Sequence, residues 1–234
     1  MRSILFDFGG TLDADGAPWI DRFFSLYRDE GVRPRREGFE EAFYSSDDSL
    51  AKRFKLSGLD LSATLTLQAQ CVLETIGPGP AASRDDIKGR VVSRFLADCR
   101  RHFRRNRPIL ERLRRRYRLA VVSNFYGNLD SVLDGEGMLD LFDAIADSGV
   151  VGSEKPGAAI FLHAARGLGV APDDCLMVGD SVRRDMRGAE GLGMPHALIA
   201  GSAAAACCPS GWVLADITEL ESRLAAAEEG HAPS

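Results

Sequence analysis

Short apolar runs recur along this chain and are separated by longer stretches of amphipathic character. The first run, Ile4-Leu5-Phe6, ends in an acid, and the later ones lie at residues 117-124, 142-147, 175-180, 196-200 and 212-214. In several stretches between them, apolar residues are three and four positions apart, which is typical of helices packed on a core. Alternating strand and helix units predict an α/β fold with a doubly wound parallel sheet, which binds ligands beyond the carboxyl ends of its strands.

The region that follows the first strand has a different pattern. Between Asp13 and Arg105 the apolar positions keep helical spacing, as at Trp19, Phe23 and Tyr27, and no stretch resembles a strand. We therefore expect an all-helical insert at residues 14-105, with residues 1-13 and 106-234 forming the sheet-containing core. Breaks are expected at residues 77-80 and at Pro108, where one helix ends and another begins.

Composition and charge narrow the class of protein. The 234 residues, 45% of them hydrophobic, are enough to bury a sizeable core. A net charge of -5 argues against a general nucleic-acid binder, and we interpret the arginine-rich run at residues 100-118 as a solvated face with acidic neighbours. No apolar span approaches membrane length, and an acid at Asp7 comes too early for a secretory signal, so we expect a cytoplasmic protein.

The cysteines and histidines do not suggest a metal site. The five cysteines are scattered without a CxxC pair, so reduced thiols are expected, with the adjacent Cys207 and Cys208 in a loop. None of the four histidines, His102, His163, His196 and His231, has the spacing of a metal ligand.

Polar side chains follow three of the predicted strands. Asp7 follows the first, Ser123 and Asn124 end the second, and Asp180 ends the run at 175-180. In a parallel sheet these ends share one edge, which brings two carboxylates and a hydroxyl together. Asp7 and Asp180 suit Mg²⁺, which prefers oxygen ligands and keeps several waters. Asp185 is expected to support these ligands from behind, although an ordinary acid at a helix start is an equally good interpretation.

The loops near these strand ends supply further candidate groups. Gly9 and Gly10 allow a tight turn with uncovered amides, and Thr11 adds a hydroxyl. Lys155 precedes Pro156, which favours an extended backbone and places the lysine just outside the following helix. An ammonium group held there can reach a dianionic ligand.

The order Asp7-Phe8-Gly9-Gly10-Thr11, Ser123, Lys155-Pro156 and Gly179-Asp180 with Asp185 resembles the four motifs of the haloacid dehalogenase superfamily of phosphohydrolases. The resemblance covers essentially the whole chain. It implies a Rossmann-like core, a helical cap inserted after the first motif, and hydrolysis of a small phosphorylated metabolite through an aspartyl-phosphate. Roles implied for individual residues are as follows: Asp7 as nucleophile; Ser123 and Lys155 as phosphoryl ligands, with Gly10, Thr11 and Asn124 beside them; and Asp7, Asp180 and the Gly9 carbonyl as Mg²⁺ ligands.

One position departs from the family pattern. Phosphatases of this family usually have a second aspartate two residues after the nucleophile, which acts as general acid and base. This chain has Gly9 at that position. Such an aspartate contributes roughly 10²–10⁴-fold to the rate. Three explanations stay open: Asp13, Asp15 or a cap residue replaces it, the leaving group needs no acid, or turnover has been lost.

Two other functions are compatible with the same motifs. A carbon–halogen hydrolase would use Asp7 without a metal, which leaves Asp180 and Asp185 unexplained. A non-catalytic protein that binds a phosphorylated ligand or a partner would explain Gly9. The sequence predicts neither the substrate nor the oligomeric state. Candidates for selectivity in the cap are Trp19, Arg22, Phe43, Tyr44, Lys52, Arg53 and Lys55.

Overall fold

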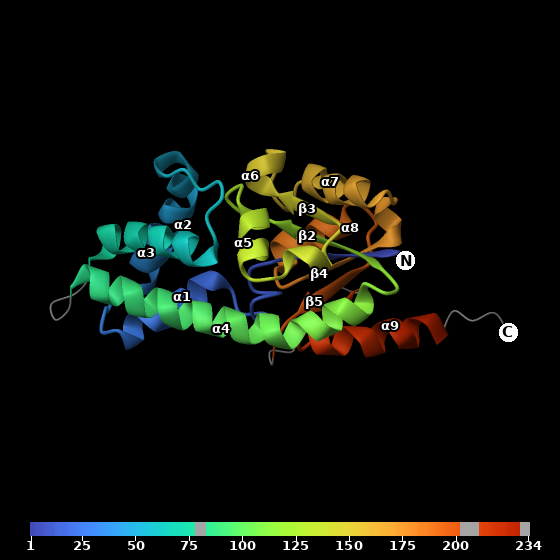
Figure 1. Cartoon of the computed structure of the whole chain (residues 1–234), viewed down its shortest axis with the longest axis horizontal. Helices are drawn as coiled ribbons and strands as arrows, with labels where there is room; N and C mark the ends of the chain where they lie inside the picture. The colour runs from blue at the N-terminus through green and yellow to red at the C-terminus, as the bar shows by residue number, and fades with distance from the viewer. Residues whose placement is uncertain (78–82, 202–210, 230–234) are drawn as a thin grey trace.

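The computed structural model describes residues 1–77, 83–201 and 211–229, and its centre is a six-stranded parallel sheet (Figure 1). The strand order is β3-β2-β1-β4-β5-β6. The strands are β1 Ser3–Phe6, β2 Arg118–Ser123, β3 Ala144–Asp147, β4 Cys175–Gly179, β5 His196–Ile199 and β6 Trp212–Leu214. β1 pairs with β2 on one side and β4 on the other, which places the three strands with polar ends next to one another. The predicted fold class is confirmed.

Helices cover both faces of this sheet (Figure 1). The α-helices are α1 Trp19–Asp29, α2 Arg36–Arg53, α3 Leu61–Ile76, α4 Arg84–Leu113, α5 Leu129–Gly135, α6 Ser148–Val151, α7 Ala158–Leu168, α8 Arg187–Glu190 and α9 Leu220–Glu229. Shorter helical turns are η1 Leu139–Leu141, η2 Pro172–Asp174, η3 Val182–Met186 and η4 Ile217–Glu219.

Alternate side chains of β1 belong to two different cores. Ile4 and Phe6 pack into the larger cluster, which includes residues of α4 and of the other helices that follow β1. Leu5 packs on the opposite face with residues of α7, such as Ile160 and Phe161. Because both faces are buried, β1 is apolar at each position from Ile4 to Phe6 rather than alternating.

Helices α1 to α4, which we call the helical insert, lie between β1 and β2 in the chain. In space α1 to α3 and the first part of α4 lie beside the sheet, and α4 then continues along it (Figure 1). Aromatic side chains fill its interior: the ring of Phe23 in α1 stacks on Phe95 in α4 with centroids 4.2 Å apart. Such pairs add about 0.5–1.5 kcal/mol beyond the area they bury. The exact limits of the insert, residues 14-105, remain a prediction, since α4 runs on without a break into the core.

The expected break at Pro108 is wrong. Pro108 lies inside α4, which continues to Leu113. A proline inside a helix costs about 3 kcal/mol because it removes one backbone donor and crowds the preceding turn. Here Phe103, Ile109 and Leu110 stay on one buried face across the proline. Packing of that face against the sheet outweighs the local cost.

The arginine-rich run has the acidic neighbours that we expected. Arg100 pairs with Glu136, Arg105 with Asp15, Arg107 with Asp140, Arg112 with Glu221, and Arg116 with Glu228.

Cys71, Cys99 and Cys175 are buried free thiols. The predictions for Cys207, Cys208, His231 and most of the 77-80 break lie outside the described residues.

Smaller differences concern where elements begin and end. The helix expected to start at Pro156 begins at Ala158, and the strand expected over 142-147 begins at Ala144. Lys155 stands outside α7, as predicted from the proline that follows it.

Candidate active site

A cavity of about 590 Å³ opens where the carboxyl ends of β1, β2 and β4 meet the helical insert. Asp7, Ser123, Lys155 and Asp180 all line it. These residues are up to 173 positions apart in the chain (from 7 to 180), and the adjacent pairing of the three strands brings them together. The convergence expected at this edge of the sheet is present.

Lys155 is a buried cation of this cavity, whose lining also includes the exposed Arg183 and Arg184. Its Nζ lies 2.6 Å from Asp7 Oδ1 and 2.6 Å from Asp185 Oδ1, and its side chain is 2% exposed. Burial lowers the pKa of Lys155, but the carboxylates of Asp185 and Asp7 raise it more, so the net shift is upward and the ammonium form is retained. Asp185 therefore holds the lysine against Asp7.

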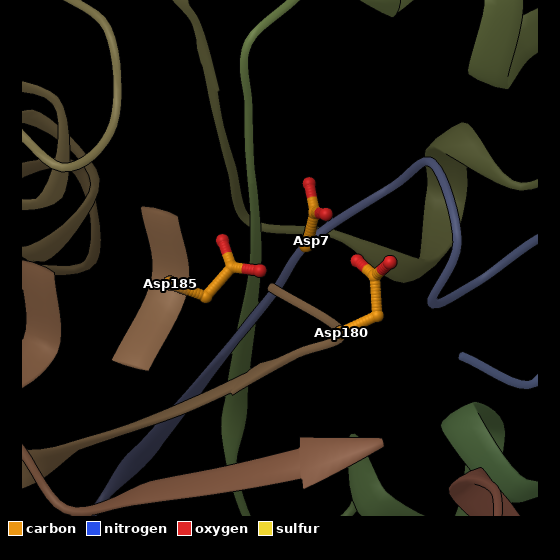
Figure 2. Close-up of side chains that lie close together, drawn as sticks. All are labelled: Asp7, Asp180 and Asp185. Atoms are coloured by element: carbon orange, nitrogen blue, oxygen red, sulfur yellow. The ribbon is translucent and has the colours of Figure 1, made fainter. Parts of the chain in front are cut away.

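Asp7, Asp180 and Asp185 form a tight acidic cluster (Figure 2). Each offers a carboxylate oxygen, and the three oxygens lie within 4.8 Å of one another. Burial, followed by the charges of Asp7 and Asp185, raises the pKa of Asp180 well above its usual value. Burial also raises the pKa of Asp185 to about 6, against the opposing effect of Lys155. A divalent cation bound to oxygen ligands would relieve this repulsion, so the donor set fits Mg²⁺.

Two glycines make this close approach sterically feasible. A Cβ on Gly10 would lie 2.3 Å from Asp180 Oδ2, and the φ of Gly10 is +91°, in the region that favours glycine. A Cβ on Gly179 would lie 2.4 Å from Asp185 Oδ2. Both carboxylates thus occupy space that any larger residue at these positions would fill.

The predicted phosphate-binding amides at Gly10 and Thr11 already have acceptors within the chain. Gly10 N donates to Asp13 Oδ1 at 2.6 Å, and Thr11 N donates to the carbonyl of Phe8 at 3.3 Å. The Thr11 hydroxyl donates to Asp180 Oδ1 at 3.4 Å and so faces the acidic cluster. We therefore do not assign these two amides to a phosphate ligand.

Asn124 lines the cavity, so its expected place beside the phosphate stays a prediction, and its side chain also holds Lys155. Its side-chain oxygen accepts from Lys155 N at 2.7 Å, and its Nδ2 donates to the Lys155 carbonyl at 3.2 Å. Both ends of the amide thus hold the backbone of Lys155, which makes Asn124 a positioning residue. Ser123 remains the hydroxyl of β2 that lines the cavity and is 4% exposed.

Gly9 faces an aromatic side chain where a second aspartate would stand. A Cβ on Gly9 would lie 3.0 Å from Trp19 Nε1. Asp13 fixes that indole by accepting its N–H at 2.7 Å, and it also accepts from Arg22 at 2.7 Å. The side chain of Asp13 is fully buried and fully engaged. Asp15 pairs with Arg105 at 2.5 Å, and neither aspartate lines the cavity, so neither replaces the acid missing at Gly9.

Sequence reasoning missed one acid of the cavity, Asp47 in α2. Its Oδ1 accepts from the Tyr126 hydroxyl at 2.5 Å and from Gln68 Nε2 at 2.6 Å. The three residues come from α2, α3 and the loop after β2, so no local spacing could have grouped them. Of these three residues, only Tyr126 could have been linked to the site from the sequence, because it comes three residues after Ser123.

Part of the expected selectivity set lies at the cavity. Trp19, Phe43 and Tyr44 line it, as predicted for residues of the insert. Arg22 is instead buried against Asp13, and Arg53 pairs with Glu74. Neither these two arginines nor Lys52 and Lys55 belong to the described lining of this cavity.

None of the helices in the described ranges combines the length and the apolar character needed to cross a membrane.

Comparison with known proteins gives relatives of one family. A protein-family model described as a haloacid dehalogenase-like hydrolase matches residues 1–193. Haloacid dehalogenase-like hydrolase domain-containing protein 3 of Bos taurus is 40% identical over 88 residues, which is 38% of this chain and only 35% of that protein. The chain thus spans about a third of that relative. A phosphoserine phosphatase of Thermus thermophilus is 28% identical over 204 residues, covering 82% of this chain and 79% of that protein.

Solved structures share the fold over nearly the whole chain. A magnesium-bound HAD-hydrolase from Bacillus subtilis superposes with a TM-score of 0.57 at 17% identity, covering 96% of this chain and 98% of that one. A dehalogenase captured with an intermediate superposes with a TM-score of 0.65 at 18% identity, covering 95% and 96%. The family match spans both the acidic cluster and Lys155, and from it we conclude that the chain belongs to the haloacid dehalogenase-like hydrolases.

Proposed function

We propose that this protein hydrolyses the phosphate ester of a small metabolite, with Mg²⁺ as cofactor and an aspartyl-phosphate on Asp7 as intermediate. The observation that carries the proposal is the position of the Asp7 carboxylate, which meets Lys155 at 2.6 Å within a cluster of three acids. A nucleophile, a buried cation and oxygen ligands for a metal are the groups that phosphoryl transfer uses.

The residues would divide the work as follows. A carboxylate oxygen of Asp7 attacks phosphorus, the bond from phosphorus to the ester oxygen breaks, and the leaving oxygen takes a proton from solvent water. A water molecule then attacks the phosphorus of the aspartyl-phosphate and gives its proton to solvent; the bond from phosphorus to the Asp7 oxygen breaks, which restores the carboxylate and releases inorganic phosphate. The Lys155 ammonium and the Ser123 hydroxyl would offset the charge on the phosphoryl oxygens.

Mg²⁺ would bind Asp7, Asp180 and the Gly9 carbonyl, and when bound it would supply positive charge beside the phosphoryl group. Asp185 would act indirectly, by fixing Lys155 and the Ser181 amide, which donates to Asp185 Oδ2 at 3.0 Å. We assign the helical insert as the cap, because Trp19, Phe43 and Tyr44 cover the cavity from that side. A closed cap would exclude water while the ester is bound.

Several relatives support the reaction class without agreeing on a substrate. Besides the phosphoserine phosphatase, a glyceraldehyde 3-phosphate phosphatase of Methanopyrus kandleri is 43% identical over 58 residues, 25% of each chain. Their names specify different phosphorylated molecules. The metabolite therefore has to be inferred from this cavity itself.

The test is phosphate release from a panel of phosphorylated metabolites by the purified protein. We expect release with Mg²⁺ and none after EDTA. Turnover of 2-haloacids that survives EDTA would instead support the carbon–halogen hydrolase. Thermal stabilisation by inorganic phosphate without turnover of any compound would support the non-catalytic binding protein suggested by Gly9.

A further inference from the structure

Asp47 is an acid in the cavity wall that the proposed reaction does not use. It lies in α2 of the helical insert, and among the described residues it is the one cavity-lining carboxylate outside the cluster of Asp7, Asp180 and Asp185. Its Oδ1 accepts both of its hydrogen bonds, from Tyr126 and Gln68. Over the described parts of the chain, Oδ2 receives no hydrogen bond and is the oxygen available to a ligand.

Neutral groups hold this carboxylate in place. Tyr126 and Gln68 are uncharged donors, and within the described residues Asp47 makes no ion pair. Burial raises the pKa of Asp47 to about 6, and the two hydrogen bonds and the charge of Arg184 only partly oppose that shift. A half-buried carboxylate whose two hydrogen-bond donors are both uncharged is costly, so a ligand that brings a positive charge to Oδ2 would be favoured.

The shape of the cavity indicates where that charge would lie on a substrate. Lys155 and the acidic cluster mark the phosphoryl end, and no hydrogen bond or ion pair joins them to Asp47 in the described structure. Trp19, Phe43 and Phe125 also line the cavity, and aromatic rings suit a small organic cation. A ligand with its phosphoryl group on Asp7 would therefore extend its leaving group toward Asp47.

We propose that Asp47 binds an ammonium group on the leaving group, so that the substrates are phosphate monoesters of small amino alcohols, including hydroxy-amino acids. The inference rests on the proposed function for its placement of the phosphoryl end. Arg184, an exposed cation that also lines the cavity, is available for a carboxylate on the same leaving group. Tyr126 and Gln68 are positioning residues that hold Oδ1 and so orient Oδ2.

The experiment measures binding without turnover, so that it does not depend on catalysis. In the Asp7→Asn protein with Mg²⁺, calorimetry compares matched pairs: O-phosphoethanolamine with propyl phosphate, and O-phosphoserine with 3-phosphoglycerate. The members of each pair differ chiefly by the ammonium group. We expect the ammonium compound of each pair to bind about tenfold more tightly or better, as for a desolvated charge pair.

Adding Asp47→Asn should abolish that preference and leave the affinity for the two analogues without an ammonium group within about threefold of its value before the change. Asp48→Asn is the matched control, because Asp48 is an exposed neighbour on the same helix. Tyr126→Phe keeps the carboxylate and removes one positioning donor, so it should reduce the preference partially. It also serves as the second variant if Asp47→Asn does not fold.

Equal affinity for both members of each pair, or a preference unchanged by Asp47→Asn, would overturn the proposal. A second result would also overturn it: Asp47→Asn slows hydrolysis of all alkyl phosphates equally and leaves p-nitrophenyl phosphate hydrolysis unchanged. That result would make Asp47 the proton donor to the leaving group. Selective ammonium binding by a protein that releases no phosphate would support this inference and refute the proposed function.

Discussion

Gly9 and Trp19 are matched to each other: a Cβ on Gly9 would lie 3.0 Å from the indole Nε1, and that nitrogen is fixed by its hydrogen bond to Asp13. The Cβ of an aspartate at position 9 would crowd the indole, which would have to shift by a few tenths of an ångström. Glycine at position 9, where the family usually has aspartate, therefore depends on the placement of Trp19 and Asp13. The single change Gly9→Asp does not restore the family pattern.

Gly9→Asp is expected to lower stability by about 1–3 kcal/mol through overpacking, and not to increase the turnover rate. A thermal melt and a phosphate-release assay measure the two effects. Gly38→Asp is the control for adding a carboxylate, because nothing lies within 4 Å of a Cβ there. A Gly9→Asp protein with unchanged melting temperature and faster turnover would show that the Trp19 ring moves aside at little cost.

Gly10→Ala should impair both folding and activity. The new Cβ would meet Asp180 Oδ2 at 2.3 Å, and the residue would have to adopt a φ of +91°. Gly58→Ala imposes a similar φ of +82° with no atom within 4 Å, so it isolates the backbone strain of about 1 kcal/mol. The difference between the two variants in a thermal melt measures the contact with Asp180. Equal losses would mean that Asp180 moves aside freely.

Removing Arg22 is expected to be far more damaging than removing an exposed arginine. Arg22 is 10% exposed and pairs at 2.7 Å with Asp13, which is 0% exposed. Arg22→Ala leaves that carboxylate buried without its guanidinium, a change that typically costs about 3–5 kcal/mol. Arg36→Ala breaks the exposed pairs with Asp21 and Glu40 and should cost about 1 kcal/mol or less. Urea denaturation of both variants measures the two losses of stability. Equal losses would contradict the prediction.

The contribution of Asp47 to the free energy of unfolding should fall as the pH rises from about 4 to about 6. Its pKa is about 6 in the folded chain against 3.8 ordinarily, so in this window the native state binds more protons than the unfolded state. Linkage then makes the free energy of unfolding decrease with pH, by about 2 kcal/mol at most. In Asp47→Asn that contribution is absent, and the stability of the variant relative to wild type should rise over the same window. A constant difference between the two proteins would contradict the raised pKa.

Much of the fold was predictable because the strands are short apolar runs with polar ends. The run at 117-124 became β2, and the run at 175-180 became β4 with Asp180 at its end. The break at Pro108 was mispredicted because local proline chemistry does not report how strongly α4 packs on the sheet.

The charged groups of the site were predictable where a strand or a proline places the residue. Asp7, Ser123, Lys155 and Asp180 meet at the cavity for that reason. Asp47 was not predictable, because its partners come from separate elements and depend on how the helical insert packs on the core. The capture of the Gly10 amide by Asp13 depends likewise on loop geometry that the sequence does not specify.

The proposed reaction requires the Asp7 carboxylate to be the group that attacks phosphorus. The most direct measurement is phosphate release by wild type and Asp7→Asn in Mg²⁺, on the most active compound of the panel, with the fold of both checked by thermal melting. We expect Asp7→Asn to stay folded and its rate to drop by at least about 10³-fold, because an amide oxygen is a poor nucleophile. A folded Asp7→Asn protein that releases phosphate at the wild-type rate would contradict the proposed reaction.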